Sequence, residues 1–154
     1  MTELEKIFLT SGLTVVVGAL VFVIQRFVLE PLNEQSKVLG RITFALYYHR
    51  REYGNPIQKA DGAEGTKNYR EASNRIRELG GLLAETSQSV RLYWICVLLR
   101  GTRRRKRIDD AIGLLTGLSN SFFIEDCATP MAGFKNCNDA DEVLKLLRLR
   151  KWGK

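Results

Sequence analysis

The sequence predicts an all-α protein, with a single N-terminal transmembrane helix followed by a cytoplasmic bundle of about four helices. Three observations lead to this fold class. Residues 7–24 contain no Asp, Glu, Lys, Arg or His. The later segments space their apolar residues three and four positions apart, as amphipathic helices do. After the span, no stretch alternates apolar and polar residues as a half-buried strand would. We therefore expect two parts, a tail and span over residues 1–29 and a helical domain over residues 30–154.

Residues 7–24 are long enough to cross a membrane. At 1.5 Å per residue they cover about 27 Å, and a bilayer's hydrocarbon core is about 30 Å thick. Phe27, Val28 and Leu29 lengthen the segment, while Arg26 can extend its charge to the headgroups. A buried core helix and a cleaved signal peptide are the alternatives. A core helix rarely lacks a polar face for so long, and a signal peptide needs a more basic start than MTELEK.

The charges beside the span predict its orientation. Lys6 alone precedes the span, whereas Arg26, Lys37 and Arg41 follow it. Loops rich in Lys and Arg stay in the cytoplasm. We therefore expect a bacterial inner-membrane protein with a tail of about six residues outside and the remainder inside. The whole chain carries a formal charge of +7, and residues 25–154 account for all of this excess.

Cysteine usage agrees with a reducing compartment. The chain has three cysteines, and no two of them are spaced as C-x-x-C. An odd number without that spacing predicts neither a disulfide framework nor a zinc site.

One face of the span is built from small residues. Ser11, Thr14 and Gly18 follow the i, i+3, i+7 spacing of a single helical face. The Thr14 and Gly18 pair has the small-xxx-small pattern that lets two helices approach closely in a membrane. We therefore expect a homo-oligomer that packs through this face, with ordinary span composition as the alternative.

The first half of the domain predicts two helices. Pro31 marks the membrane exit, and it starts or kinks a helix expected over residues 31–53. Residues 57–67 contain two glycines and few apolar residues, so we expect a loop there. A second helix follows over residues 68–88, and a Gly-Gly pair at residues 80–81 argues against one straight helix.

The second half predicts two more helices. Residues 92–99 are apolar but too few to cross a bilayer, so they form either a buried helix or a segment at the membrane interface. An amphipathic helix is expected over residues 108–122, and residues 125–137 are irregular. Asn138 is expected to cap the last helix, because acidic residues follow it where the first helical turn favours them.

An unbroken basic run lies in the middle of the domain. The predicted contact residues for an anionic lipid or ligand are Arg100, Arg103, Arg104, Arg105, Lys106 and Arg107. Near an anionic membrane each basic residue contributes about 1 kcal/mol, which favours contact with membrane lipids. A solvated loop that only reinforces topology is the second interpretation. Binding of a nucleic acid or nucleotide ranks third, because the run lacks interleaved aromatic residues.

The sequence offers little catalytic chemistry. His49 is the only histidine, and nothing in the sequence places a nucleophile beside it. Phosphate-binding loops, zinc motifs and nucleophile elbows are not found in the sequence. The acidic pairs at residues 109–110 and 125–126 are adjacent, and adjacent residues do not face each other on a helix. We therefore predict no enzyme, no cofactor and no metal, although a deep pocket around His49 would favour an enzyme.

Two blocks of the chain resemble a group of small uncharacterised bacterial membrane proteins. These have one N-terminal span followed by an E-P-x-x-E-Q-like stretch. The first block is residues 27–35, continued by Val-Leu-Gly at 38–40, Ile42, Leu-Tyr-Tyr at 46–48 and Asn-Pro at 55–56. The second block is the Gly-Leu-Ser-Asn-Ser stretch at residues 117–121. The resemblance covers about half of the chain and supports the architecture, but it implies no activity.

The first block contains a membrane-exit motif, defined as Glu30, Pro31, Glu34 and Gln35. The polar second block follows an amphipathic helix. Its Ser119 and Asn120 are expected either to cap that helix or to bond back to the backbone near the membrane-exit motif.

These features favour a non-catalytic function. The expected protein is a single-pass, membrane-anchored interaction or scaffold protein. It is oligomeric, binds an unknown protein partner and holds its basic domain near the inner leaflet. The alternative is an effector that perturbs the membrane by forming a pore or by depolarising the cell, for example in defence. Its cytoplasmic domain would then sense an anionic ligand or partner.

Overall fold

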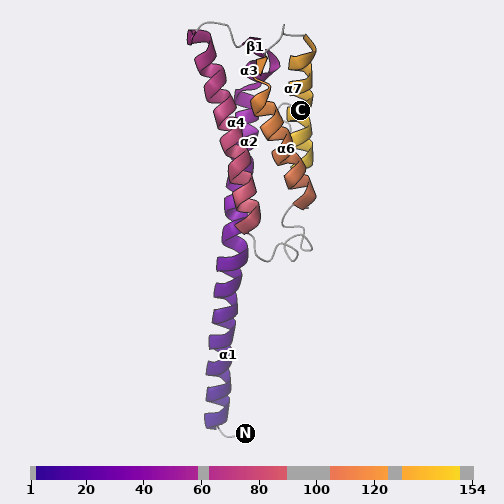
Figure 1. Cartoon of the computed structure of the whole chain (residues 1–154). Helices are drawn as coiled ribbons and strands as arrows, with labels where there is room; N and C mark the ends of the chain where they lie inside the picture. Colours follow the sequence, from indigo (N-terminus) through magenta and orange to yellow (C-terminus); the bar gives the residue numbers. More distant parts are fainter. Residues whose placement is uncertain (1–2, 59–62, 90–104, 125–129, 150–154) are drawn as a thin grey trace.

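The computed structural model describes residues 3–58, 63–89, 105–124 and 130–149. It is a helical bundle from which one long helix projects, as Figure 1 shows. The helices are α1 (Glu3–Ile24), η1 (Gln25–Leu29), α2 (Glu30–Tyr48), α3 (Arg50–Gly54), α4 (Ala63–Ser89), α6 (Arg105–Asn120) and α7 (Pro130–Leu146). The predicted helical fold class is confirmed. The apolar segment at 92–99 lies outside the described residues.

The helices α1, η1 and α2 follow one another without a break (Figure 1). The η1 segment is a π-helical turn, and the backbone N–H of Glu30 donates to the carbonyl oxygen of Gln25. Pro31 explains the turn, since proline has no N–H and its ring crowds the carbonyl four residues earlier. A π turn is one of the known ways to accommodate such a defect. The expected new or kinked helix at Pro31 is therefore a continuation of the same helix.

The apolar part of this helix is not covered by the rest of the chain. Among the described residues, one helix is long and apolar enough to cross a membrane, Thr10–Tyr48, and none of its most apolar stretch is buried. Phe8, Val15 and Phe22 are 78%, 72% and 65% exposed. The buried-core-helix alternative is therefore wrong.

The bundle is an up-and-down arrangement of four main helices. In Figure 1, α2 runs away from α1, α4 returns toward it, α6 runs away again and α7 returns. The helix α4 packs against both α2 and α6, and α7 packs against α6 and the short α3. Each helix contributes apolar side chains to one core, among them Ile42, Leu46, Ile76, Leu83, Ile108, Leu115, Leu118, Val143 and Leu147.

Two helix boundaries differ from the sequence prediction. The helix α4 starts at Ala63, within the expected loop, and runs through the Gly-Gly pair without interruption. A Cβ atom on Gly80 would lie 3.6 Å from Cβ of Leu115, so a small residue suits the contact between α4 and α6. The helix α7 starts at Pro130, because proline fits the first helical turn. Asn138 therefore lies inside α7, and the prediction that it caps a helix is wrong.

A short parallel strand pair lies at the end of the bundle farthest from α1 (Figure 1). The strands β1 (Ile57–Gln58) and β2 (Phe123–Ile124) pair Ile57 with Phe123. The N–H of Ile57 also donates to the carbonyl oxygen of Phe122 at 3.2 Å. Two-residue strands are too short to alternate recognisably, so the sequence pattern did not predict them.

Candidate functional site

The small-residue face of α1 is open in the structure. Ser11, Thr14 and Gly18 all lie on α1 and are exposed. A Cβ atom on Gly18 would meet no atom within 4 Å. The Thr14 hydroxyl donates to the carbonyl oxygen of Thr10 at 2.8 Å, so its polar group is satisfied within the helix. This face therefore has room for a second helix.

The membrane-exit motif divides between the surface and the core. Arg26 Nη1 lies 2.8 Å from Glu30 Oε2 in an exposed ion pair across the π turn. Glu34 is exposed and Pro31 is half-buried, whereas Gln35 is only 2% exposed. The motif is therefore not a single cluster, because Gln35 belongs to the bundle and Glu30 belongs to the helix surface.

The Gly-Leu-Ser-Asn-Ser stretch lies far from that motif. It ends α6, at the opposite end of the bundle from the start of α2 (Figure 1). Ser119 donates to the Thr116 carbonyl oxygen at 2.8 Å, and its own carbonyl oxygen accepts from the Ser73 hydroxyl at 2.7 Å. Asn120 accepts from Arg77 of α4 at 2.6 Å. The expected bond back to the membrane-exit motif is therefore wrong. The stretch forms the end of α6 and joins it to α4 by hydrogen bonds.

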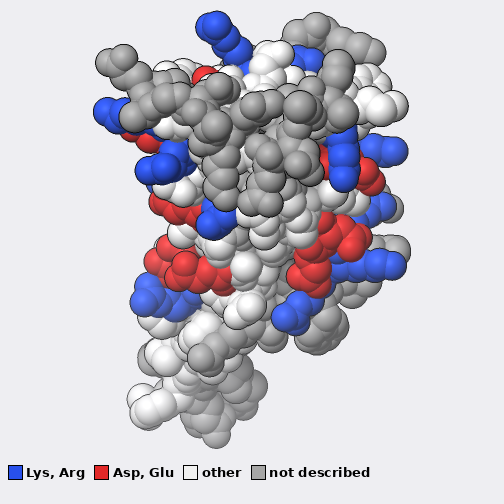
Figure 2. All heavy atoms as spheres, turned by 45° about the horizontal axis from the view of Figure 1, so that its top comes forward, with Lys and Arg blue, Asp and Glu red and all other residues white. Residues whose placement is uncertain are grey.

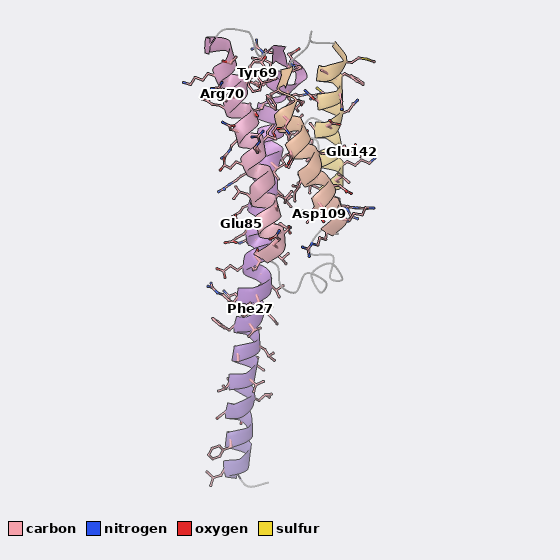
Figure 3. The ribbon with its side chains drawn as sticks, viewed as in Figure 1. Phe27, Tyr69, Arg70, Glu85, Asp109 and Glu142 are labelled. Atoms are coloured by element: carbon pink, nitrogen blue, oxygen red, sulfur yellow. The ribbon has the colours of Figure 1, made fainter. Side chains whose placement is uncertain are left out.

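Part of the basic run lies at the end of the bundle nearest α1. Arg105, Lys106 and Arg107 form the first turn of α6, while Arg100, Arg103 and Arg104 lie outside the described residues. Figure 3 shows Asp109 of α6 and Glu85 of α4 at the end of the bundle nearest Phe27. Cations are unfavourable at a helix N-terminus, so helix stability does not explain these three.

Charged side chains gather on the bundle. In Figure 2 the blue and red atoms are scattered over the bundle, and the described atoms of the projecting end are white. Basic and acidic side chains alternate over the face that the figure shows. Positive and negative charge are therefore mixed on this face of the bundle.

One groove between α2 and α4 has a local excess of positive charge, and the sequence alone did not predict it. Its volume is about 520 Å³, within the range of small-molecule sites. The lining residues are Lys37, Gly40, Arg41, Phe44, Ala45, Tyr48 and His49 of the α2 segment and Arg75 of α4. We call it the cationic groove, because this lining includes three permanent cations and no carboxylate.

Two of the groove's cations have no acidic partner. Among the described residues, Lys37 and Arg41 take part in no ion pair. They lie four positions apart on one helix, where like charges repel by about 0.2–0.5 kcal/mol. Arg75 is held by Glu78 at 2.8 Å, which leaves part of its five-donor guanidinium available. The groove is thus a place where an anion would relieve repulsion.

An aromatic ridge forms one wall of the groove. Phe44 and Tyr48 are 69% and 68% exposed, and their rings stack with centroids 5.6 Å apart and an interplanar angle of 19°. A second groove of about 550 Å³ lies along the same two residues and is lined otherwise by Gly40, Thr43 and Tyr47. The ridge therefore separates a cationic groove from an apolar one.

His49 closes the far end of the cationic groove. Burial lowers the pKa of its imidazole below 6.5, and Arg75 lowers it further, whereas Glu52 and Glu71 raise it. Its Nδ1 atom lies 3.9 Å from Glu52 Oε2, and its ring meets that of Tyr48 edge-on at 4.9 Å. The described lining contains no Ser, Thr or Cys beside this histidine.

Helical spacing carried a signal for this site. Lys37 and Arg41 are four residues apart, as are Phe44 and Tyr48, so α2 presents paired cations beside paired rings. The sequence could not reveal that α4 brings Arg75 to the same place, because that contact spans 34 to 38 positions of chain.

Comparison of the chain with known protein families, with curated proteins and with solved structures found no match. The resemblance to small bacterial membrane proteins therefore stays a prediction.

Proposed function

We propose that the protein is a single-pass, membrane-anchored interaction or scaffold protein of the bacterial inner membrane. The observation that carries this proposal is the uncovered apolar surface of α1, of which no part of the most apolar stretch is buried. Soluble monomers rarely leave contiguous apolar patches of more than a few hundred Å² exposed to water. A bilayer would cover this surface on all sides of the helix.

The arrangement of charge supports a cytoplasmic bundle. Arg26 lies just before the end of the span, and the first turn of α6 adds three cations at the same end of the bundle (Figure 3). Basic groups beside a span favour the cytoplasmic side, and they attract anionic headgroups of the inner leaflet. We therefore place the basic surface near that leaflet, with the N-terminal tail outside.

Membrane fractionation with an alkaline wash tests the anchoring proposal. The wild-type chain is expected to stay with the membranes. Replacing Val17→Arg and Val21→Arg should release it, because charges at the centre of a span are costly. The matched variant Val17→Leu with Val21→Leu should stay bound. Release of the wild-type chain by the wash would contradict the proposal.

A scaffold also requires a partner and should leave the membrane intact. We expect a stable protein to co-purify with the detergent-solubilised chain, and overexpression to leave the membrane potential unchanged.

A membrane-perturbing effector is the second candidate, and one observation favours it. The cationic groove and the apolar segment share one uninterrupted helix from Glu3 to Tyr48. A ligand on α2 would therefore act on the same rigid element that enters the bilayer. An effector should depolarise cells when it is overexpressed, and Thr14→Leu with Gly18→Leu should relieve this by blocking close helix contact. An unchanged membrane potential in every condition would exclude this candidate.

A further inference from the structure

We propose that the cationic groove between α2 and α4 binds a small phosphorylated compound that carries a planar aromatic ring, the chemical class of nucleotides. The phosphate would lie among Lys37, Arg41 and Arg75, and the ring would stack on the ridge of Phe44 and Tyr48. This inference goes beyond membrane anchoring and stands without it.

The charge distribution selects the phosphate position. Lys37 and Arg41 lack acidic partners among the described residues, and Arg75 approaches from the neighbouring helix. Guanidinium groups bind phosphate through paired, charge-assisted hydrogen bonds. Of the acids near the groove, Glu78 pairs with Arg75 and leaves part of that guanidinium available, whereas Glu52 and Glu71 act on His49. The anion therefore belongs beside Lys37 and Arg41, with Arg75 on the facing helix.

The aromatic ridge selects a ligand with a ring. Tyr48 and Phe44 expose about two-thirds of their surface beside the cations. Flat, exposed rings that adjoin basic side chains are the platforms on which bases stack. An inorganic anion would use the cations and leave the ridge in water.

The distance of the groove from the end of the apolar segment favours a soluble ligand over a lipid headgroup. Along α2, Lys37 lies about 12 Å beyond Leu29 and Tyr48 about 28 Å beyond it, at 1.5 Å per residue. The headgroup region adds only about 5–8 Å to each side of the hydrocarbon core. Most of the groove would therefore lie beyond the headgroups.

Titration calorimetry on the full chain in nanodiscs of neutral phosphatidylcholine tests the inference. The probes are AMP, ribose 5-phosphate, which lacks the ring, and adenosine, which lacks the phosphate. AMP is expected to bind at least about fivefold more tightly than either fragment, because it uses both the cations and the ridge.

Variants locate the binding site. Arg41→Gln and Arg75→Gln should each weaken AMP about tenfold or more, because each removes a charge-assisted contact. Arg70→Gln, an exposed arginine of the same helix α4 outside the groove lining, should leave AMP binding unchanged. Tyr48→Leu should reduce the affinity for AMP toward that for ribose 5-phosphate, and Tyr48→Phe should retain it.

Three results would overturn the inference. AMP could fail to bind at millimolar concentration, or Arg41→Gln and Arg75→Gln could bind it as the wild type does. Alternatively, AMP could fail to bind while, in nanodiscs that contain phosphatidylglycerol, these two substitutions abolish retention of that lipid, which would assign the cations to a lipid headgroup.

Discussion

The backbone of α7 meets the backbone of α3 at Gly133 and Gly54. A Cβ atom on Gly133 would overlap the carbonyl oxygen of Gly54, while one on Gly54 would lie 3.4 Å from Sγ of Cys137. The two helices can therefore cross this closely only because Gly133 has no side chain. This contact fixes how the last helix closes the bundle.

Replacing Gly133→Ala should destabilise the bundle by about 1–3 kcal/mol, the usual cost of overpacking. The control is Gly113→Ala on α6, where a Cβ atom meets nothing within 4 Å. That substitution should stabilise the protein by up to about 1 kcal/mol through helix propensity. Thermal unfolding followed by circular dichroism in detergent measures both. Equal stability of the two variants would contradict the close contact.

A buried amide should hold α7 to α3 as well. Asn136 is 2% exposed, and its Nδ2 atom donates to the carbonyl oxygen of Tyr53 at 2.9 Å. Asn136→Ala would leave that carbonyl unsatisfied and should cost about 1–3 kcal/mol. Asn74→Ala, at an exposed position of α4, should change stability by less than about 0.5 kcal/mol. Chemical denaturation of both variants measures the difference.

Stability should depend on the protonation of His49. Burial lowers the pKa of the folded imidazole below its ordinary value of 6.5, so the unfolded chain binds this proton more readily. The contribution of His49 to stability is therefore fully present above pH 6.5, and it is lost as the pH falls toward the folded pKa. The free energy of unfolding of the wild type, relative to that of His49→Gln, should decrease as the pH falls from 7.5 to 5.5. An increase of this relative stability on acidification would contradict burial of the imidazole.

The small-residue face should govern self-association of the span. Thr14→Leu with Gly18→Leu would fill the space that lets two helices approach, so the oligomer in detergent should dissociate. The control is Val16→Leu with Val23→Leu, which lie on the opposite helical face. Sedimentation or light scattering measures the mass. A wild-type chain that is strictly monomeric would rule out this interface.

Periodicity predicted the elements that depend on a continuous pattern. The seam of α4, including Ile76 and Leu83, and the apolar face of α6 were correctly identified, because burial on one side enforces helical spacing. Boundaries set by packing were missed. The helix α7 starts at Pro130, earlier than expected, and its close contact with α3 at Gly133 and Gly54 is one that no local pattern reveals.

The candidate sites differ in the same respect, because one lies on a single helix and the other is formed by two helices. The small-residue face lies on one helix, so spacing alone was enough to place Thr14 and Gly18 together, and their role in packing stays a prediction. The cationic groove needs Arg75 from α4 beside Arg41 from α2, and the packing of two helices determines that contact. The predicted hydrogen bond from Ser119 to the backbone near the membrane-exit motif is wrong, because α6 ends at the other end of the bundle and helix packing sets that position.

The placement of the chain across the bilayer is the central claim, and cysteine labelling in intact cells tests it most directly. The three native cysteines are first replaced by serine, and single cysteines are then introduced as Thr2→Cys in the tail or Arg70→Cys on exposed α4. A membrane-impermeant maleimide is expected to label the tail in intact cells and α4 only after permeabilisation. Labelling of the α4 cysteine in intact cells would contradict the proposed topology.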